Sequence, residues 1–150
     1  MNVFLPPEAA VDEQAVLIDF ASVGVGYGLA DVAMHLTHAV LSEDLADGGE
    51  ERLIDAYLAA LAEARGPEAT VYPKELAMRH YMLGVVDYGR FVVGRSWVKA
   101  TPESFAAKAC NTNIGLWNQR VDCALAFVAR IDECLQHFEA QGDISDLMRN

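Results

Sequence analysis

Helical periodicity is the feature of this sequence that most limits its possible folds. Over residues 29–41 the apolar residues recur three or four positions apart, which places them on one stripe of a helix. Residues 50–64 repeat the pattern, and Gly66-Pro67 ends it. In this second helix the residues expected to face inward are Leu53, Tyr57, Leu61 and Ala64.

The second half of the chain is also predicted to be helical. One helix is expected over residues 73–97. Another starts at Thr101-Pro102-Glu103, which combines a hydroxyl N-cap, a proline at the first helical position and an acid in the first turn. A break is expected around residues 111–115, and a long final helix over residues 116–140. The sequence therefore predicts about five helices.

Strands are predicted only at the N-terminus. Residues 2–5 and 15–18 are short apolar runs that could form a β-hairpin over residues 2–19, and Asp19 follows the second run. Three glycines at 24, 26 and 28 then form a loop. Because one hairpin is not a stable sheet, its strands should lie on the helices or pair with strands outside this chain. The predicted fold class is mainly α, in one domain spanning residues 1–150.

Composition excludes several classes of protein. The chain is 53% hydrophobic and 22% charged, so disorder is not expected, and its net charge of −11 disfavours nucleic acid and anionic membranes as partners. A polyphosphate would need Mg²⁺ to bridge the like charges. No apolar run is long enough for a membrane span. The three cysteines are interpreted as reduced, small buried side chains, and the expected location is cytoplasmic.

Asn2 and Asp19 are the candidate metal ligands. A carboxylate at a strand end, with an amide oxygen on the preceding strand, could hold Mg²⁺ together with phosphate oxygens. The alternative is a solvated Asn and an Asp that begins a turn.

A second candidate metal site is a Zn²⁺ site formed by Asp31, His35 and His38, which share one helical stripe. The alternative is that these residues form an ordinary polar face of the helix.

The run NVFL…AVLIDFASVGVGYGLADVAMHL resembles the core of the aminoglycoside phosphotransferase and choline/ecdysteroid kinase-like families, which are relatives of the protein kinases. Those proteins carry His-Gly-Asp-x-x-x-x-Asn, a hairpin, a strand ending in Ile-Asp-Phe/Trp, and an Asp-Leu-Ala helix. Asn2 matches the end of the first motif, Asp19 the metal-binding Asp, and Asp31-Val32-Ala33 the helix start. Residues 53–66 are similar to a further family helix.

The resemblance implies a C-terminal lobe of a protein-kinase-like fold. It implies that Asn2 and Asp19 hold Mg²⁺, that Asp31 braces the catalytic loop, and that ATP supplies the phosphoryl group to a small-molecule hydroxyl acceptor. The catalytic Asp is expected upstream of Met1, and the ATP-binding lobe is not in this chain, so Mg²⁺ and ATP should bind weakly or not at all. Ala21 stands where a strict motif has Gly.

Later helices shape the acceptor pocket in the resembling enzymes, so the resemblance also suggests pocket residues. The candidates are Tyr81, Tyr88, Arg90 and Trp97; the alternative is that the aromatic residues belong to the core and that Arg90 forms a surface ion pair with Asp87. The exposed lobe interface could support self-association.

Three functional hypotheses remain open at this point. The first is the C-terminal portion of a small-molecule phosphotransferase, inactive as this chain alone. The second is a catalytically silent helical binding or scaffold module derived from such a kinase. The third is a fragment without a role of its own.

Overall fold

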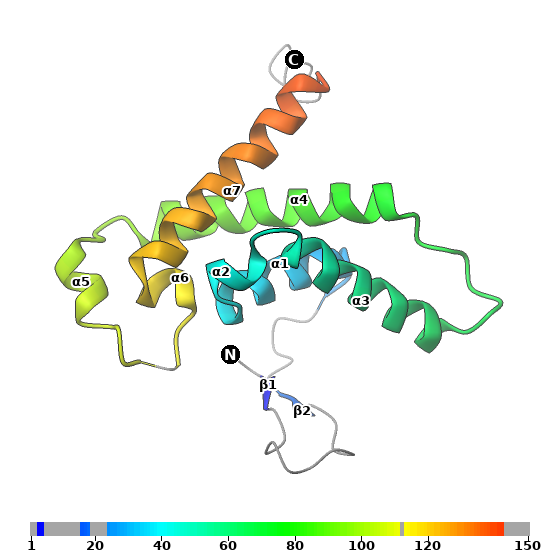
Figure 1. Cartoon of the computed structure of the whole chain (residues 1–150), viewed down its shortest axis with the longest axis horizontal. Helices are drawn as coiled ribbons and strands as arrows, with labels where there is room; N and C mark the ends of the chain where they lie inside the picture. The colour runs from blue at the N-terminus through cyan, green and yellow to red at the C-terminus, as the bar shows by residue number, and fades with distance from the viewer. Residues whose placement is uncertain (1–2, 5–15, 19–23, 112, 143–150) are drawn as a thin grey trace.

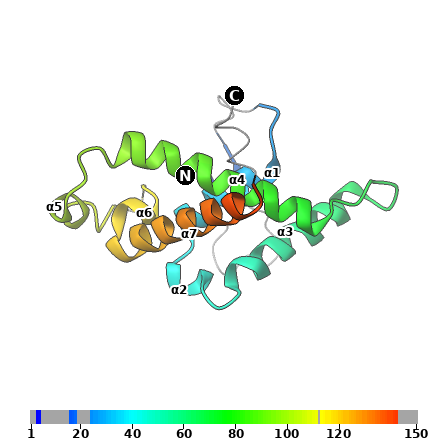
Figure 2. The same cartoon turned by 90° about the horizontal axis from the view of Figure 1, so that it is seen from above.

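The computed structural model describes residues 3–4, 16–18, 24–111 and 113–142, and it is mainly helical, as predicted (Figure 1). The two long helices α4 and α7 cross each other, and α1 lies alongside α4 (Figures 1 and 2). The helices are α1 Gly28–Ala39, α2 Ser42–Leu45, α3 Gly49–Arg65, α4 Lys74–Phe91, the π-helical turn η1 Val92–Ser96, α5 Pro102–Ala106, α6 Leu116–Gln119 and α7 Val121–Ala140.

The core lies where α1, α4 and α7 meet. Two glycines on α4 make this packing possible. A Cβ at Gly84 would stand 2.7 Å from Ala30 Cα on α1, and one at Gly89 would stand 2.5 Å from Ile131 Cδ1 on α7. The backbone of α1 therefore approaches α4 more closely than a side chain at residue 84 would allow, and the Ile131 side chain of α7 fills the space beside Gly89. The core side chains are Leu29, Ala33, Leu36, Ile54, Ala77, Tyr81, Val85, Val92, Trp117, Phe127 and Cys134.

At the N-terminus, β1 Val3–Phe4 pairs antiparallel with β2 Val16–Leu17, so that Val3 lies opposite Leu17 and Phe4 opposite Val16. Two residues per strand do not establish the hairpin predicted over residues 2–19, most of which lies outside the described residues. The protein-kinase-like fold therefore remains a prediction.

The inward face predicted for α3 is wrong in part. Ile54 is the fully buried residue of this helix, whereas Leu53 is 39% exposed and Ala64 is also exposed. The reason is the course of α3, which meets the core with its first turns and then extends away from α4 (Figure 1). Most residues in its last turns are exposed.

The helix start predicted at Thr101 is confirmed. The backbone N–H of Ser104 donates to Thr101 Oγ1 at 3.2 Å, and Ser104 Oγ accepts from the Thr101 N–H at 3.0 Å, which is a capping box. The final helix predicted over 116–140 is instead two helices, α6 and α7. Arg120 between them is extended, with φ −120° and ψ 129°.

Candidate functional site

The two predicted metal ligands, Asn2 and Asp19, lie outside the described residues. Asp31, the predicted bracing residue, is exposed in the first turn of α1, the helix that follows the glycine loop. This position places the carboxylate near the positive end of the helix dipole.

The alternative Zn²⁺ site is not supported by the described part of the chain, which contains no group of three His, Cys, Asp or Glu side chains able to hold a metal ion. His35 is exposed, whereas His38 turns toward the core. The His38 ring lies edge-on to Trp117 with its centroid 5.6 Å away, and its Nδ1 is 3.0 Å from the Met34 carbonyl oxygen.

Two of the predicted pocket residues, Tyr88 and Trp97, belong to one aromatic cluster with His38, Trp117 and Phe127. The Tyr88 hydroxyl is 3.2 Å from each ring nitrogen of His38, and the Trp97 ring is 5.8 Å from Trp117. Burial raises the pKa of Tyr88 to about 12 and lowers the pKa of His38. Burial in this cluster therefore disfavours the charged form of both side chains.

This cluster is closely packed. A Cβ at Gly115 would stand 2.6 Å from Trp117 Nε1 and 2.5 Å from His38 Cδ2, so the loop backbone presses on both rings. The buried indole nitrogens of Trp97 and Trp117 have no hydrogen-bond partner among the described residues. The arrangement agrees with the alternative that these aromatic residues are core.

Arg90 lies on the surface, away from the other three pocket candidates. Its guanidinium donates to Asp87 at 2.9 Å, and both side chains are 76% exposed. This is the surface ion pair that the i, i+3 spacing predicts.

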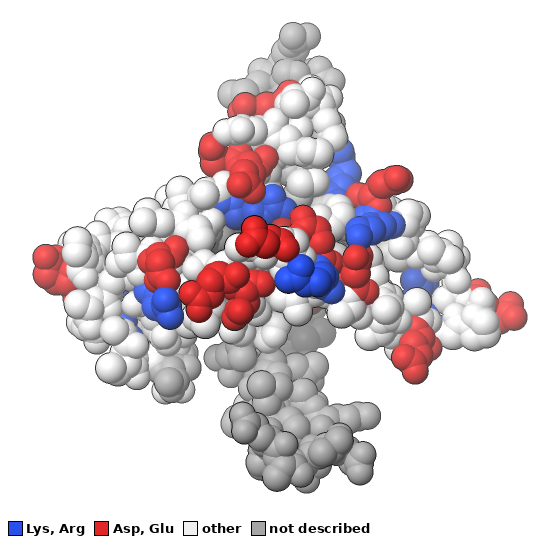
Figure 3. All heavy atoms as spheres, viewed as in Figure 1, with Lys and Arg blue, Asp and Glu red and all other residues white. Residues whose placement is uncertain are grey.

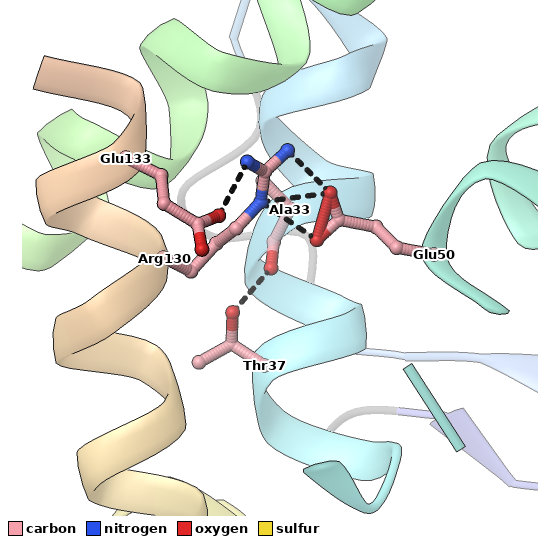
Figure 4. A network of polar contacts seen from close by, with 5 residues as sticks. All are labelled: Ala33, Thr37, Glu50, Arg130 and Glu133. Atoms are coloured by element: carbon pink, nitrogen blue, oxygen red, sulfur yellow. Dashed lines mark hydrogen bonds and ion pairs between the residues drawn. The ribbon is translucent and has the colours of Figure 1, made fainter. Parts of the chain in front are cut away.

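Tyr81, the fourth candidate, lines a cavity of about 290 Å³ between α1, α2, α4 and α7. The cavity has apolar walls and a polar group at one side. The polar group is formed by Glu50, Arg130 and Glu133 (Figure 4). The lining residues are Thr37, Val40, Ser42, Leu45, Ala46, Glu50, Tyr81, Val85, Cys123, Ala126, Phe127, Ala129, Arg130 and Glu133.

Arg130 is the centre of this polar group. Its Nε donates to both carboxylate oxygens of Glu50, at 2.9 and 3.0 Å, and its second terminal nitrogen donates to Glu50 Oε1 at 2.5 Å. Its first terminal nitrogen donates to Glu133 at 3.2 Å. All three nitrogens of the guanidinium thus face carboxylates, in the fork geometry that arginine favours.

Glu50 is the second residue of α3 and is buried, with 8% of its surface exposed. Burial alone would lower the pKa of Arg130, but the hydrogen bonds and charge of Glu50 raise it above its ordinary value. Burial also raises the pKa of Tyr81, and the adjacent Glu50 carboxylate raises it further. The ion pair between Glu50 and Arg130 links α3 to α7, although the two residues are 80 positions apart in the sequence.

Sequence reasoning missed Glu50 and Arg130. A signal was present for Arg130, since it falls on the same stripe of α7 as Cys123, Phe127 and Cys134, which are buried. A charged residue on an apolar helical stripe indicates a buried partner. No local pattern identifies that partner as Glu50.

Acidic side chains gather on the face formed by α2, the start of α3 and α7, as Figure 3 shows in red, with a few basic side chains between them.

In the described part of the chain no helix is both long and apolar enough to cross a bilayer. Two of the three cysteines, Cys123 and Cys134, are buried as expected, but Cys110 is exposed.

Comparison with known proteins finds no match to a family model, to a curated protein or to a solved structure. Any assignment to a family therefore depends on the motifs near the N-terminus.

Proposed function

We propose that this chain is the C-terminal portion of a small-molecule phosphotransferase of the aminoglycoside phosphotransferase and choline/ecdysteroid kinase-like type. In the complete enzyme the γ-phosphoryl group of ATP passes to a hydroxyl of the acceptor. Asn2 and Asp19 hold Mg²⁺, and Asp31 accepts hydrogen bonds from the catalytic-loop backbone.

The order of the N-terminal elements supports this proposal. In an antiparallel pair with Val3 opposite Leu17, the start of β1 and the end of β2 lie at the same end. In the sequence, Asn2 immediately precedes β1 and Asp19 comes two residues after β2. The glycine loop and α1 follow, with Asp31 exposed in its first turn. This is the order that the family motifs require.

Alone, this chain is not expected to transfer phosphate. Catalysis of phosphoryl transfer depends on a loop and a lysine at the phosphates, metals on Asp and Asn, and an Asp at the acceptor hydroxyl. Two metal ligands leave Mg·ATP weakly held. A ligand at or below its Kd adds only about 0.4 kcal/mol of stability, so millimolar Mg·ATP should cause little thermal shift.

Paramagnetic relaxation by Mn²⁺ detects such weak binding and tests the metal site. In ¹⁵N-labelled chain, low Mn²⁺ should broaden the amide signals of Val3 and Leu17, and Asp19→Asn should abolish this broadening. The matched control Asp87→Asn removes the same charge from an exposed ion pair and should leave it unchanged. Equal broadening in the wild-type chain and in Asp19→Asn would contradict the metal assignment.

A second candidate function, a catalytically silent binding module, is favoured by a different observation. The cavity between α1, α2, α4 and α7 has the apolar lining and few polar groups that are typical of small-molecule sites.

Self-association through an exposed apolar face is also proposed. Val121, Leu125 and Val128 recur at i, i+4 and i+7 on α7 and are 48%, 65% and 46% exposed. Since the net charge of −11 repels like chains, association should strengthen with added salt. Sedimentation should show a dimer at high salt that Leu125→Glu dissociates; a monomer at all concentrations and salt levels would refute this proposal.

A further inference from the structure

We propose that the cavity lined by Tyr81, Glu50, Arg130 and Glu133 is a binding site for a small monoamine with an apolar body. The proposal does not depend on phosphotransferase function. The cavity is at the C-terminal end of α1, where Thr37 and Val40 line it, whereas Asp31 is in the first turn. At 1.5 Å per residue the two ends of α1 are about 13 Å apart between Asp31 and Val40.

The volume and the apolar lining of the cavity determine which kind of molecule could fit. About 290 Å³ is at the lower end of the range for small-molecule sites. Leu45, Val85 and Phe127, from three different helices, form an apolar surface that suits a phenyl or alkyl group. A sugar-like ligand would leave its hydroxyls without partners against these walls, so polyhydroxylated amines are disfavoured.

The net charge of the polar group in the cavity determines the charge that a ligand should carry. Glu50 and Glu133 each carry a negative charge and Arg130 one positive charge, so the group is net negative. Every nitrogen of the Arg130 guanidinium donates to one of these carboxylates, so its positive charge is already paired within the group. A carboxylate or phosphate would meet net repulsion, and an ammonium group would meet net attraction.

Hydrogen-bond acceptors for an ammonium are present beside this group. Glu133 Oε2 accepts from Arg130, and Oε1 of the same carboxylate is a further acceptor. Thr37 Oγ1 donates its hydrogen to the Ala33 carbonyl at 2.8 Å, so its oxygen lone pairs can accept (Figure 4). Charged hydrogen bonds to such oxygens are stronger than neutral ones.

Access to the cavity is along α7. Ala126 and Ala129 line the cavity and are themselves exposed, so small side chains border its opening. The acidic face around this opening, seen in Figure 3, raises the local concentration of cations.

The test is an NMR titration of the ¹⁵N-labelled chain at fixed, moderate salt with three ligands of matched shape: 2-phenylethylamine, 2-phenylethanol and phenylacetate. Saturable shifts are expected at Thr37, Val85 and Phe127 with the amine, weaker ones with the alcohol and none with the carboxylate. Glucosamine, an amine without an apolar body, should not saturate. Equal binding of amine and carboxylate, or shifts that avoid the cavity, would overturn the proposal.

Matched variants distinguish specific binding of the amine in the cavity from general attraction of a cation to an acidic protein. Glu133→Gln should weaken amine binding by no more than about fivefold, because the Glu133 side chain is 65% exposed, and should leave binding of the alcohol unchanged. Asp132→Asn makes the same change of charge one position away, outside the cavity lining, and should have no effect. Equal effects of the two substitutions would refute a specific ammonium site.

A second pair of variants tests the apolar part. Ala129→Phe should fill the opening and abolish saturable binding of both amine and alcohol, whereas Ala140→Phe, the same change at an exposed position of α7 that does not line the cavity, should not. Circular dichroism confirms that each variant is folded. If Ala129→Phe unfolds the chain, the Glu133 and Asp132 pair alone decides the proposal. Unchanged amine binding in a folded Ala129→Phe chain would refute it.

Discussion

Removal of the Arg130 guanidinium should destabilise the fold more than any other loss of a single ion pair described here. Arg130→Met keeps most of the apolar stem and deletes the donors, so that Glu50 is left buried with its carboxylate unpaired. Breaking a buried ion pair from one side costs about 3–5 kcal/mol. The Arg130 side chain is 26% exposed and that of Glu50 11%, so water can partly replace the lost donors. We therefore expect a loss of about 2–4 kcal/mol.

The matched control is Arg90→Met. Its pair with Asp87 also involves a guanidinium and a carboxylate at 2.9 Å, but both side chains are 76% exposed. An exposed pair of this kind is worth well under about 1 kcal/mol. Urea unfolding followed by circular dichroism should therefore show a clearly lower midpoint for Arg130→Met and a nearly unchanged one for Arg90→Met.

The double variant Glu50→Leu/Arg130→Met sharpens the test. Removing both partners eliminates the unpaired buried charge, so much of the lost stability should return. If Arg130→Met unfolds at the same urea concentration as Arg90→Met, or if the double variant is no more stable than Arg130→Met, the pair does not hold α3 to α7 as the structure indicates.

Three further predictions concern the core and the thiols. Because burial lowers the pKa of His38 from 6.5, the unfolded chain binds its proton more tightly, so unfolding free energy should fall as pH drops through 6.5, and His38→Gln should flatten this dependence in urea titrations at several pH values. Gly84→Ala should cost about 1–3 kcal/mol by thermal unfolding, since its Cβ would meet α1, whereas Gly94→Ala, with open space around it, should not destabilise. Of the three thiols only that of Cys110 should react rapidly with a disulfide reagent in the native chain, because Cys123 and Cys134 are buried and burial raises the pKa of Cys134 to about 11.

Local signals in the sequence predicted most of the helices. Periodicity identified α1 and α3, and the capping signal at Thr101 located the start of α5, because both depend on residues within a few positions of each other. Which side of α3 faces the core could not be predicted from such local patterns. Leu53 and Ile54 are adjacent and equally apolar, and only the position of the neighbouring helices decides which is buried.

The residues of the candidate site were even harder to predict from local sequence patterns. Tyr81 was selected on the basis of a resemblance, and it does line the cavity, but the residues that define the charge of that cavity are 80 positions apart. Tyr88 and Trp97, selected on the same basis, pack instead into the aromatic cluster around Trp117. Aromatic residues serve a core or a pocket equally well, and the sequence pattern does not distinguish the two.

The Glu50–Arg130 pair couples the cavity to the attachment of α3. Glu50 lies at the start of this helix and Arg130 borders the cavity. Tyr57 and Leu58 still pack against the core, whereas most residues of the last turns of α3 are exposed. A ligand that binds beside Glu133 and Arg130 therefore contacts the same group that fixes the first turn of α3. Since a ligand stabilises the state that binds it, an amine at this site should protect the amides of the first turns of α3 from hydrogen exchange more than those of its last turns. The attachment of α3 and the binding of a small molecule would then involve the same group of charged residues, Glu50, Arg130 and Glu133.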